Sequence, residues 1–278
     1  MEKEIRRLTT ILLGIPVAVL ALILIYPLLY SLYISFFDYN LLSGVDPVFV
    51  GLKNYTDLLS NSEFWQSLWI TNVFVVVSVV LQMVLGFMLA LLMYRNFRGS
   101  NILRPAFLLP YVIPPSIVGI MWKWLLNADY GILRWFCDLL NIPAFSVLGD
   151  SSFAIYGIVL ADVWHMTPIV FLLLIGGLQA IPNTVYEAAD VDGASGIRRL
   201  FYITIPMMRK IITVTLVYRI LTAVRTFDKV LAMTQGGPGT STQILSWFIY
   251  SEGFKAYDFG SASAMSYVML VVVLVFCT

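Results

Sequence analysis

The sequence predicts an all-α, polytopic membrane protein with about six transmembrane helices. Of its 278 residues, 60% are hydrophobic and only 12% are charged, whereas a soluble domain carries about 25% charged residues. Six stretches are apolar over the length of about 20 residues that a bilayer-spanning helix needs. The formal net charge of +1 by itself says nothing about nucleic acid, and no nucleic-acid partner is expected for a membrane protein of this composition. We therefore expect a single transmembrane domain over residues 1–278, surrounded by membrane lipid.

The six stretches differ in how well they suit a lipid environment. The second contains no charged residue, whereas four prolines interrupt the third and two arginines lie in the fifth. The predicted spans are 11–37, 70–94, 103–122, 153–178, 211–228 and 259–277.

The first apolar stretch follows Lys3, Arg6 and Arg7, an arrangement that secretory signals share. The stretch is too long for the apolar core of a signal, and no small-residue cleavage site follows it. We therefore expect a retained first helix. The last span runs to Cys277 without a basic tail, which leaves room for a cytoplasmic tail beyond the given residues.

The distribution of Lys and Arg predicts the orientation, because short cytoplasmic loops are enriched in these residues. One set of segments holds ten of them in 49 positions, and the alternate set holds five in 91. The denser set comprises 1–10, 95–104 and 182–210, and the other comprises 38–66, 123–152 and 229–260. We therefore expect the denser set, together with both termini, to face the cytoplasm.

The cytoplasmic segment 182–206 carries clear helix signals. Thr184 and Glu187 have the spacing of a capping box, in which each side chain binds a free backbone N–H at a helix start. Gly193 is expected to end this helix, because glycine adopts the left-handed conformation without a Cβ clash.

A second short helix is expected directly afterwards. Ser195 can cap its start, and the helix should extend through Ile203 and end at Pro206. The segment is therefore predicted to form a helix, a sharp turn and a second helix. Such a projection suits the presentation of a rigid surface to a cytoplasmic partner; the alternative is an ordered loop at the membrane surface.

The residues of this segment resemble a family motif. Glu187-Ala188-Ala189, then Gly193, then Ile203-Thr204-Ile205-Pro206 are similar to the EAA motif of permeases from binding-protein-dependent ABC importers. The spacing matches throughout, and the one departure is Ile205, where the family usually has Leu. Other segments resemble the carbohydrate-uptake branch (maltose, glycerol-phosphate or trehalose type): 109–114, 122–131, 177–182 and 227–238.

The resemblance implies a type I ABC importer permease architecture, in which Glu187 to Gly193 forms a cytoplasmic coupling helix. The implied partners are a second, different permease chain, a dimer of ATPase subunits and an extracytoplasmic solute-binding protein. ATP would bind to the ATPase, so no cofactor is expected in this chain. The implied location is a bacterial or archaeal plasma membrane. The implied cargo is a sugar, polyol or glycerol phosphate derivative, which the permease would move by alternating access. The expected coupling residues are Glu187, Ala188, Ala189, Gly193, Ile203 and Pro206.

The motifs of an enzyme are absent from the sequence. It contains no G-x-x-x-x-G-K-[ST] phosphate-binding loop, and a single histidine leaves little basis for a catalytic triad or a metal site. An ion-gradient-driven secondary transporter is the alternative function. Such transporters often show internal repeats, which this sequence lacks, and the 182–206 segment would then have no explanation.

Charged residues inside the predicted spans are costly to bury and therefore indicate function. Asp162 and Arg219 each lie ten residues inside a span end, about 15 Å along a helix. We predict that they pair near mid-membrane beside the translocation path; partners on the other permease, or separate hydration, are the alternatives. Arg225 and Asp228 are expected to form a local i,i+3 pair.

A path for sugars should offer polar side chains and aromatic rings at this depth. Each candidate taken alone is more often a polar residue that packs between helices. The candidates for the substrate pathway are Asn72, Gln82, Asp162, Trp164, His165, Tyr218, Arg219 and Thr222.

Overall fold

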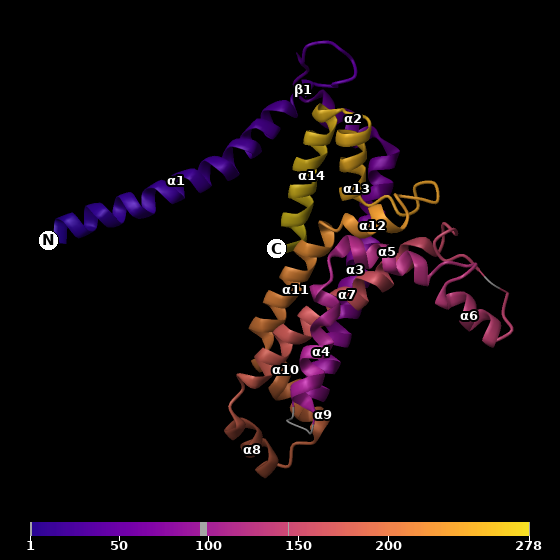
Figure 1. The fold of residues 1–278 in the computed structure, drawn as a ribbon. Coiled ribbons are helices and arrows are strands. Elements are labelled where there is room, and N and C mark those ends of the chain that lie inside the picture. Colours follow the sequence, from indigo (N-terminus) through magenta and orange to yellow (C-terminus); the bar gives the residue numbers. More distant parts are fainter. Residues whose placement is uncertain (1, 95–98, 144, 278) are drawn as a thin grey trace. The chain divides into compact units, whose positions relative to one another are not determined.

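The structure is a computed structural model that describes residues 2–94, 99–143 and 145–277 (Figure 1). Helices dominate it, and the strands β1 and β2 form one short antiparallel pair. In chain order the elements are α1 (Glu2–Ile34), β1 (Phe37–Asp38), β2 (Val48–Phe49), α2 (Lys53–Ser60), α3 (Ser62–Met93), α4 (Ser100–Val112), α5 (Pro115–Leu125), α6 (Ile132–Leu139), α7 (Ala154–Gln179), α8 (Asn183–Val191), α9 (Gly196–Arg199), the π-helical turn η1 (Leu200–Thr204), α10 (Ile205–Met207), α11 (Arg209–Val224), α12 (Asp228–Met233), α13 (Leu245–Tyr250), the π-helical turn η2 (Ser251–Lys255) and α14 (Phe259–Cys277).

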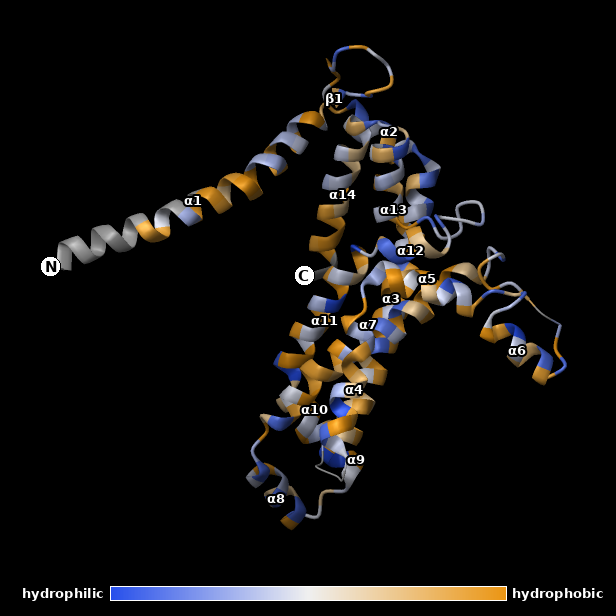
Figure 2. Ribbon diagram, viewed as in Figure 1, coloured by the Kyte–Doolittle hydropathy of each residue, from blue (hydrophilic) through white to orange (hydrophobic). Residues whose placement is uncertain are grey.

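The chain divides into two compact units. The first contains the described residues up to Phe64 together with Ile249–Val272, and the second contains Trp65–Phe248 with the last residues of the chain. In the first unit, α1 is apolar over most of its described length (Figure 2). None of the described side chains in its most apolar window, Leu12–Ile34, is buried within the chain. Such a surface suits contact with lipid or with another membrane protein.

Polar contacts hold the end of α1 to the start of α2 in this unit. Asn54 donates from Nδ2 to the carbonyl oxygens of Ser35 (2.8 Å) and Phe37 (2.9 Å). The Ser35 hydroxyl lies 2.7 Å from the Tyr55 hydroxyl. Because these contacts satisfy backbone groups where the chain leaves the helix, they fix the turn after α1.

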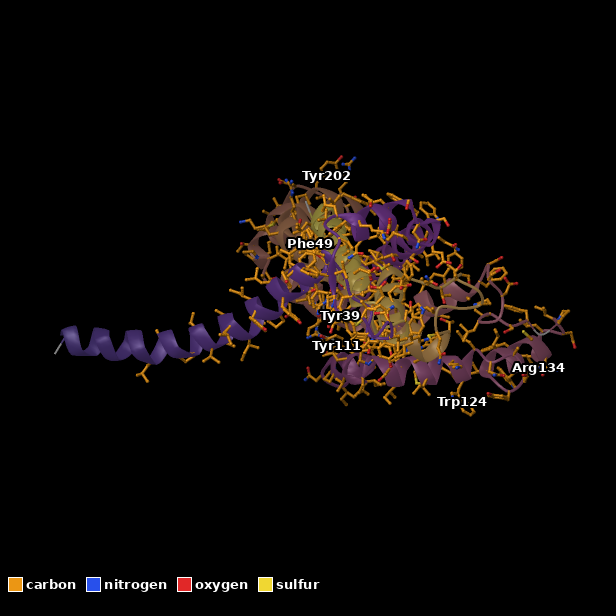
Figure 3. All side chains as sticks on the ribbon, turned by 90° about the horizontal axis from the view of Figure 1, so that it is seen from above. Tyr39, Phe49, Tyr111, Trp124, Arg134 and Tyr202 are labelled. Carbon is orange, nitrogen blue, oxygen red and sulfur yellow. The ribbon has the colours of Figure 1, made fainter. Side chains whose placement is uncertain are left out.

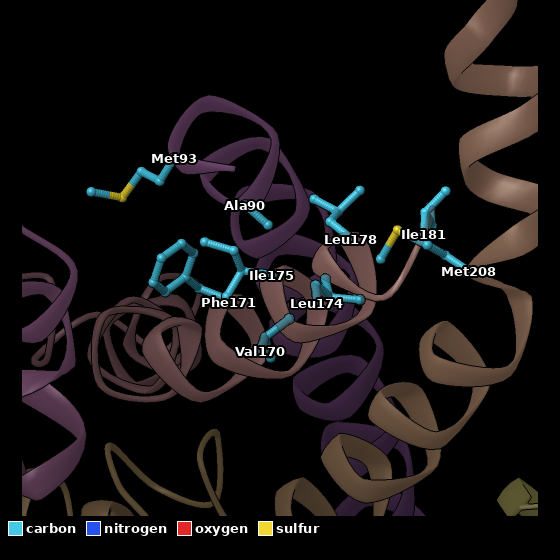
Figure 4. Close-up of a cluster of buried hydrophobic side chains, with 9 residues drawn as sticks. All are labelled: Ala90, Met93, Val170, Phe171, Leu174, Ile175, Leu178, Ile181 and Met208. Carbon is cyan, nitrogen blue, oxygen red and sulfur yellow. The ribbon is translucent and has the colours of Figure 1, made fainter. Parts of the chain in front are cut away.

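The second unit is built around α7, whose inward face is buried along most of its length. An apolar core joins α7 to α3 and to the start of α11 (Figure 4). Its members are Ala90, Met93, Val170, Phe171, Leu174, Ile175, Leu178, Ile181 and Met208. Burial of these side chains fixes the position of α7 against α3 and so aligns the polar residues that lie further along both helices.

All six predicted spans correspond to helices, but their lengths differ from the expectation. Within the described residues, three helices are long and apolar enough to cross a bilayer singly: Leu12–Ile34, Ser62–Met93 and Ala154–Gln179. Two bent pairs raise that number to five, and the last apolar helix, Phe259–Val275, is shorter. The all-α, polytopic membrane fold is thus confirmed.

The third predicted span, 103–122, is not one helix. It consists of α4 and α5, which meet at an angle of 93°. The break falls at Ile113 and Pro114, both in extended backbone conformations, because proline removes a backbone donor and disfavours helix in the residue before it. The fifth span, 211–228, is likewise shorter than expected, since α11 ends at Val224 and Asp228 begins α12.

Two details of the 182–206 segment were predicted wrongly. The start of α8 has Pro182 as its cap and no side-chain capping hydrogen bond, so the Thr184–Glu187 capping box does not form. The second helix does not end at Pro206; helical backbone continues from Gly196 to Met207. Pro206 follows shortly after the π-helical turn η1, where the regular α-helical hydrogen-bond pattern is already interrupted, so its missing N–H is tolerated there.

Candidate functional site

A buried group of four polar side chains joins α3, α7, α11 and α12 in the second unit. We call this group the charge network: Gln82, Asp162, Arg219 and Lys229. Asp162 is its centre, because its Oδ1 accepts a hydrogen bond from Lys229 Nζ (2.5 Å) and its Oδ2 accepts one from Arg219 Nη2 (3.2 Å). The pairing of Asp162 with Arg219 that the sequence predicted is therefore confirmed, and Lys229 is an additional partner.

The side-chain amide of Gln82 bridges Asp162 and Arg219. Its Nε2 donates to Asp162 Oδ2 (2.8 Å), and its Oε1 accepts from Arg219 Nε (2.7 Å). Because the amide uses both its donor and its acceptor, it holds the carboxylate and the guanidinium in one fixed arrangement. Arg219 also donates from Nη1 to Thr222 Oγ1 (2.5 Å).

Lys229 reaches the network because α12 packs closely against α5. A Cβ atom at Gly119 of α5 would lie 2.6 Å from the Cβ of Ala232 and 3.3 Å from the Cα of Lys229. Only glycine permits this approach of the two helices. A small residue in the bent α4–α5 pair therefore determines where the ammonium group lies.

A cavity of about 370 Å³ opens beside the charge network. We call it the polar cavity. Its lining includes Asp162 and Lys229 of the charge network and the neighbouring His165. The exposed residues Arg225 and Asp228 also line it. The remaining lining residues are Tyr111, Pro115, Met166, Thr222 and Thr226.

His165 connects the cavity to the break between α4 and α5. Its Nε2 lies 3.0 Å from the carbonyl oxygen of Ile113, the extended residue that directly follows α4. Its ring stacks on Tyr111, with centroids 6.3 Å apart. The freed carbonyl of the broken span is thereby satisfied by a side chain of α7, as required in an apolar environment.

The structure brings together five of the eight predicted pathway residues around the charge network: Gln82, Asp162, His165, Arg219 and Thr222. Tyr218 lies one residue away on α11, with its hydroxyl 3.4 Å from that of Tyr111. Trp164 instead lines a separate apolar groove and makes an edge contact with Trp122. Asn72 donates to its own helix at Leu68 (2.7 Å) and does not line the polar cavity. The role of all eight in transport stays a prediction.

Sequence reasoning missed Lys229, which was counted among the residues of an external loop. Lys229 is in fact buried, with 3% of the residue exposed. The predicted local pair of Arg225 and Asp228 is wrong, since the ion pairs of the described residues do not include it. Arg225 lies beyond the end of α11 and Asp228 begins α12, so the helical i,i+3 geometry is lost.

The 182–206 segment is stabilised by contacts between its two helices. The carboxylate of Asp190 on α8 pairs with the guanidinium of Arg199 on α9. Arg199 also lies 5.8 Å from the ring centre of Tyr186, and the Tyr186 hydroxyl lies 3.2 Å from Thr204 Oγ1. These links hold the two helices in one arrangement.

The turn between the helices depends on Gly193, which has φ +70° as the sequence predicted. The backbone N–H of Ala194 donates to the carbonyl of Ala189 (2.9 Å), the bond that closes a helix with a left-handed residue after it. The predicted Ser195 cap also forms, to the N–H of Arg198 (3.4 Å).

Several large apolar side chains of the segment are nevertheless exposed. Val191 is 88% exposed, and Tyr202, labelled in Figure 3, is 80% exposed. Ile197 and Phe201 are also exposed. Glu187 and Ala188 lie on the exposed part of α8, whereas Ala189 is buried, Ile203 is half-buried and Pro206 is exposed. A rigid element with exposed apolar residues is typical of a docking surface.

Comparison with known proteins identifies similar chains over nearly the whole length. Residues 82–278 match the family described as binding-protein-dependent transport system inner membrane component. The sulfoquinovosyl glycerol transport system permease protein SmoG of Agrobacterium fabrum is 36% identical over 264 residues, which cover 95% of this chain and 86% of that protein. The trehalose/maltose transport system permease protein MalF of Thermococcus litoralis is 40% identical over 231 residues, covering 82% and 77%.

A solved structure shares the fold. It is the crystal structure of a bacterial alginate ABC transporter in complex with an alginate pentasaccharide-bound periplasmic protein. The TM-score is 0.85 over all of this chain and 94% of that chain, at 20% sequence identity.

Proposed function

We propose that this chain, which belongs to the family of binding-protein-dependent transport system inner membrane components, conducts a sugar or sugar-like solute by alternating access. The chain is a multi-pass membrane permease subunit of an ABC importer and is not an enzyme. Its relatives of known name carry trehalose and maltose or sulfoquinovosyl glycerol, which supports a carbohydrate cargo. The proposed path runs beside the charge network.

We further propose that the 182–206 segment docks onto a cytoplasmic ATPase, with Glu187 to Gly193 as the coupling helix. The observation that carries this proposal is a pair of exposed helices, held together by an ion pair and by side-chain contacts, whose residues match the EAA motif in spacing. Exposed apolar residues and the Asp190–Arg199 pair support it, because a helix that transmits motion from a bound partner must be both accessible and rigid. ATP would bind to that ATPase and not to this chain.

The remaining partners follow from the same proposal. A second permease chain would complete the pathway, and a dimer of ATPase subunits would drive it from the cytoplasm. An extracytoplasmic binding protein would deliver the solute, and both termini would face the cytoplasm. An ATPase-driven change between two rigid-body states would then open the path alternately to each side.

Co-purification with the ATPase and uptake into proteoliposomes test the proposal. The expected result is that the permease retains the ATPase on an affinity column and that uptake requires ATP. Glu187→Lys should weaken retention, whereas Glu63→Lys, at an exposed glutamate outside the segment, should not. Uptake that persists without the ATPase and follows an imposed ion gradient would favour a secondary transporter and contradict the proposal.

A further inference from the structure

The charge network holds more positive than negative charge. Arg219 is 0% exposed, Lys229 is 3% exposed and Asp162 is 1% exposed. Two cations therefore share one carboxylate away from water, where an uncompensated charge is costly. The other charged lining residues, Arg225 and Asp228, are exposed and cancel each other in sign. The polar cavity and its network thus carry one excess positive charge.

Hydrogen-bond donors are also in excess there. The Lys229 ammonium has three N–H groups, and the structure shows one bond from it, to Asp162. Asp162 already accepts from Lys229, Arg219 and Gln82. His165, a lining residue that is 3% exposed, donates from Nε2 to the carbonyl oxygen of Ile113, so its Nδ1 is an acceptor. This buried Nδ1 has no hydrogen-bond partner in the described part of the chain and can accept a hydrogen bond from a hydroxyl group of a ligand.

The size of the polar cavity fits a small organic ligand. About 370 Å³ lies within the range of about 300–1,000 Å³ found for small-molecule sites. Hydroxyl groups of Thr222, Thr226 and Tyr111 add polar contacts beside Lys229. An oxyanion group at Lys229 would both accept the unused hydrogen bonds and neutralise the excess charge. A neutral sugar would leave that charge uncompensated, and a cation would be repelled.

We propose that the polar cavity binds the carboxylate, sulfonate or phosphate group of an acidic sugar, with Lys229 as its direct partner. This inference rests on the proposed function and names the class of solute. The acidic group lies against the ammonium of Lys229, while the hydroxyls of the cavity contact the sugar ring. The Asp162 carboxylate and Gln82 keep Arg219 in place behind Lys229 and do not contact the solute.

Calorimetric titration of the assembled importer in lipid nanodiscs tests the proposal. The probes are glucose, glucuronate, glucose 6-phosphate and inorganic phosphate, each titrated without ATP. Glucuronate and glucose 6-phosphate should bind about 10- to 100-fold tighter than glucose, the ratio expected from one charge-assisted hydrogen bond. The Lys229→Met variant should lose this preference for acidic sugars, whereas the Lys229→Arg variant should retain most of it. Lys123→Met, at an exposed lysine of α5, should leave it unchanged.

Three results would overturn the proposal. They are equal binding of glucose and glucuronate by the wild-type importer, a Lys229→Met variant that keeps the preference, and inorganic phosphate that binds as tightly as glucose 6-phosphate. The last result would assign the cavity to a free anion. The wild-type comparison decides even if Lys229→Met fails to assemble. Loss of ATP-dependent uptake for every sugar would instead contradict the proposed function, and this binding assay needs no ATP.

Discussion

The charge network and the 182–206 segment are both polar regions of the same unit, but they are stabilised in opposite ways. The network is buried, and its side chains satisfy one another through direct hydrogen bonds. The segment is largely exposed, and its shape depends on the turn at Gly193 and on a few contacts between its helices, among them the Asp190–Arg199 ion pair. Removing one charge from the buried network leaves its partners without compensation, whereas the Asp190–Arg199 pair of the segment is partly exposed to solvent. The first region should therefore respond to mutation through stability, and the second through function.

The largest effect is expected from Asp162→Asn, which leaves two buried cations without their carboxylate. Removing one member of a buried ion pair costs about 3–5 kcal/mol. The expected result is a strong loss of thermal stability of the purified permease. Asp129→Asn, at an exposed aspartate, serves as the control and should change little. A stable Asp162→Asn variant would mean that the network does not hold the helices together.

A second substitution sharpens this result. Adding Lys229→Met to Asp162→Asn removes one of the two uncompensated cations, so part of the lost stability should return. The interaction between the two sites in a double-mutant cycle should be about 0.5–3 kcal/mol in the favourable direction. Additive losses in thermal denaturation would show that Lys229 and Asp162 do not interact energetically.

Gly193→Ala is expected to have a smaller effect on stability but a large effect on the coupling between the permease and its ATPase. A left-handed backbone at a residue with a Cβ costs about 1–2 kcal/mol, and the cost falls on the turn alone. Solute-stimulated ATPase activity of the assembled importer should drop, while the thermal stability of the membrane helices stays nearly unchanged.

Gly196→Ala is the matched control for this variant. A Cβ atom would meet no neighbour within 4 Å at either glycine, and only Gly193 has a positive φ. Gly196→Ala should therefore retain full stimulation. Equal loss in both variants would contradict a specific role of the turn.

The smallest effect is expected from Asp190→Asn, which breaks the exposed pair with Arg199. Exposed ion pairs contribute about 0–1 kcal/mol and are screened by salt. The solute-stimulated ATPase activity of the variant importer should be slightly below that of the wild type at low ionic strength and equal to it at high salt. Asp192→Asn, at a neighbouring exposed aspartate, should show no such salt dependence. A salt-independent loss would indicate that Asp190 contacts the partner directly.

Much of this architecture follows from local sequence. The spans follow from apolar length, and the Gly193 turn follows from the special freedom of glycine. The pairing of Asp162 with Arg219 was predictable because both depths could be counted from the ends of their helices. Prolines near Ile113 indicated a weak third span, but the bend of 93° depends on packing that the sequence does not specify.

The burial of Lys229 was not predictable for the same reason. Its position follows the end of α11, so hydropathy assigns it to a loop. It is buried because α12 packs on α5 at Gly119, a contact between residues about 110 positions apart in the chain. Similarly, Asn72 and Trp164 are polar or aromatic at suitable depths, yet helix rotation directs them away from the polar cavity.

Cysteine labelling at Ala188 tests the central claim most directly. A single cysteine there, in a variant carrying Cys137→Ser and Cys277→Ser, is exposed on α8. A membrane-impermeant maleimide is expected to label this cysteine only from the cytoplasmic side, and a short cross-linker is expected to join it to the ATPase in the assembled importer. Labelling from the external side of intact cells, or no cross-link in an importer that transports, would contradict the account.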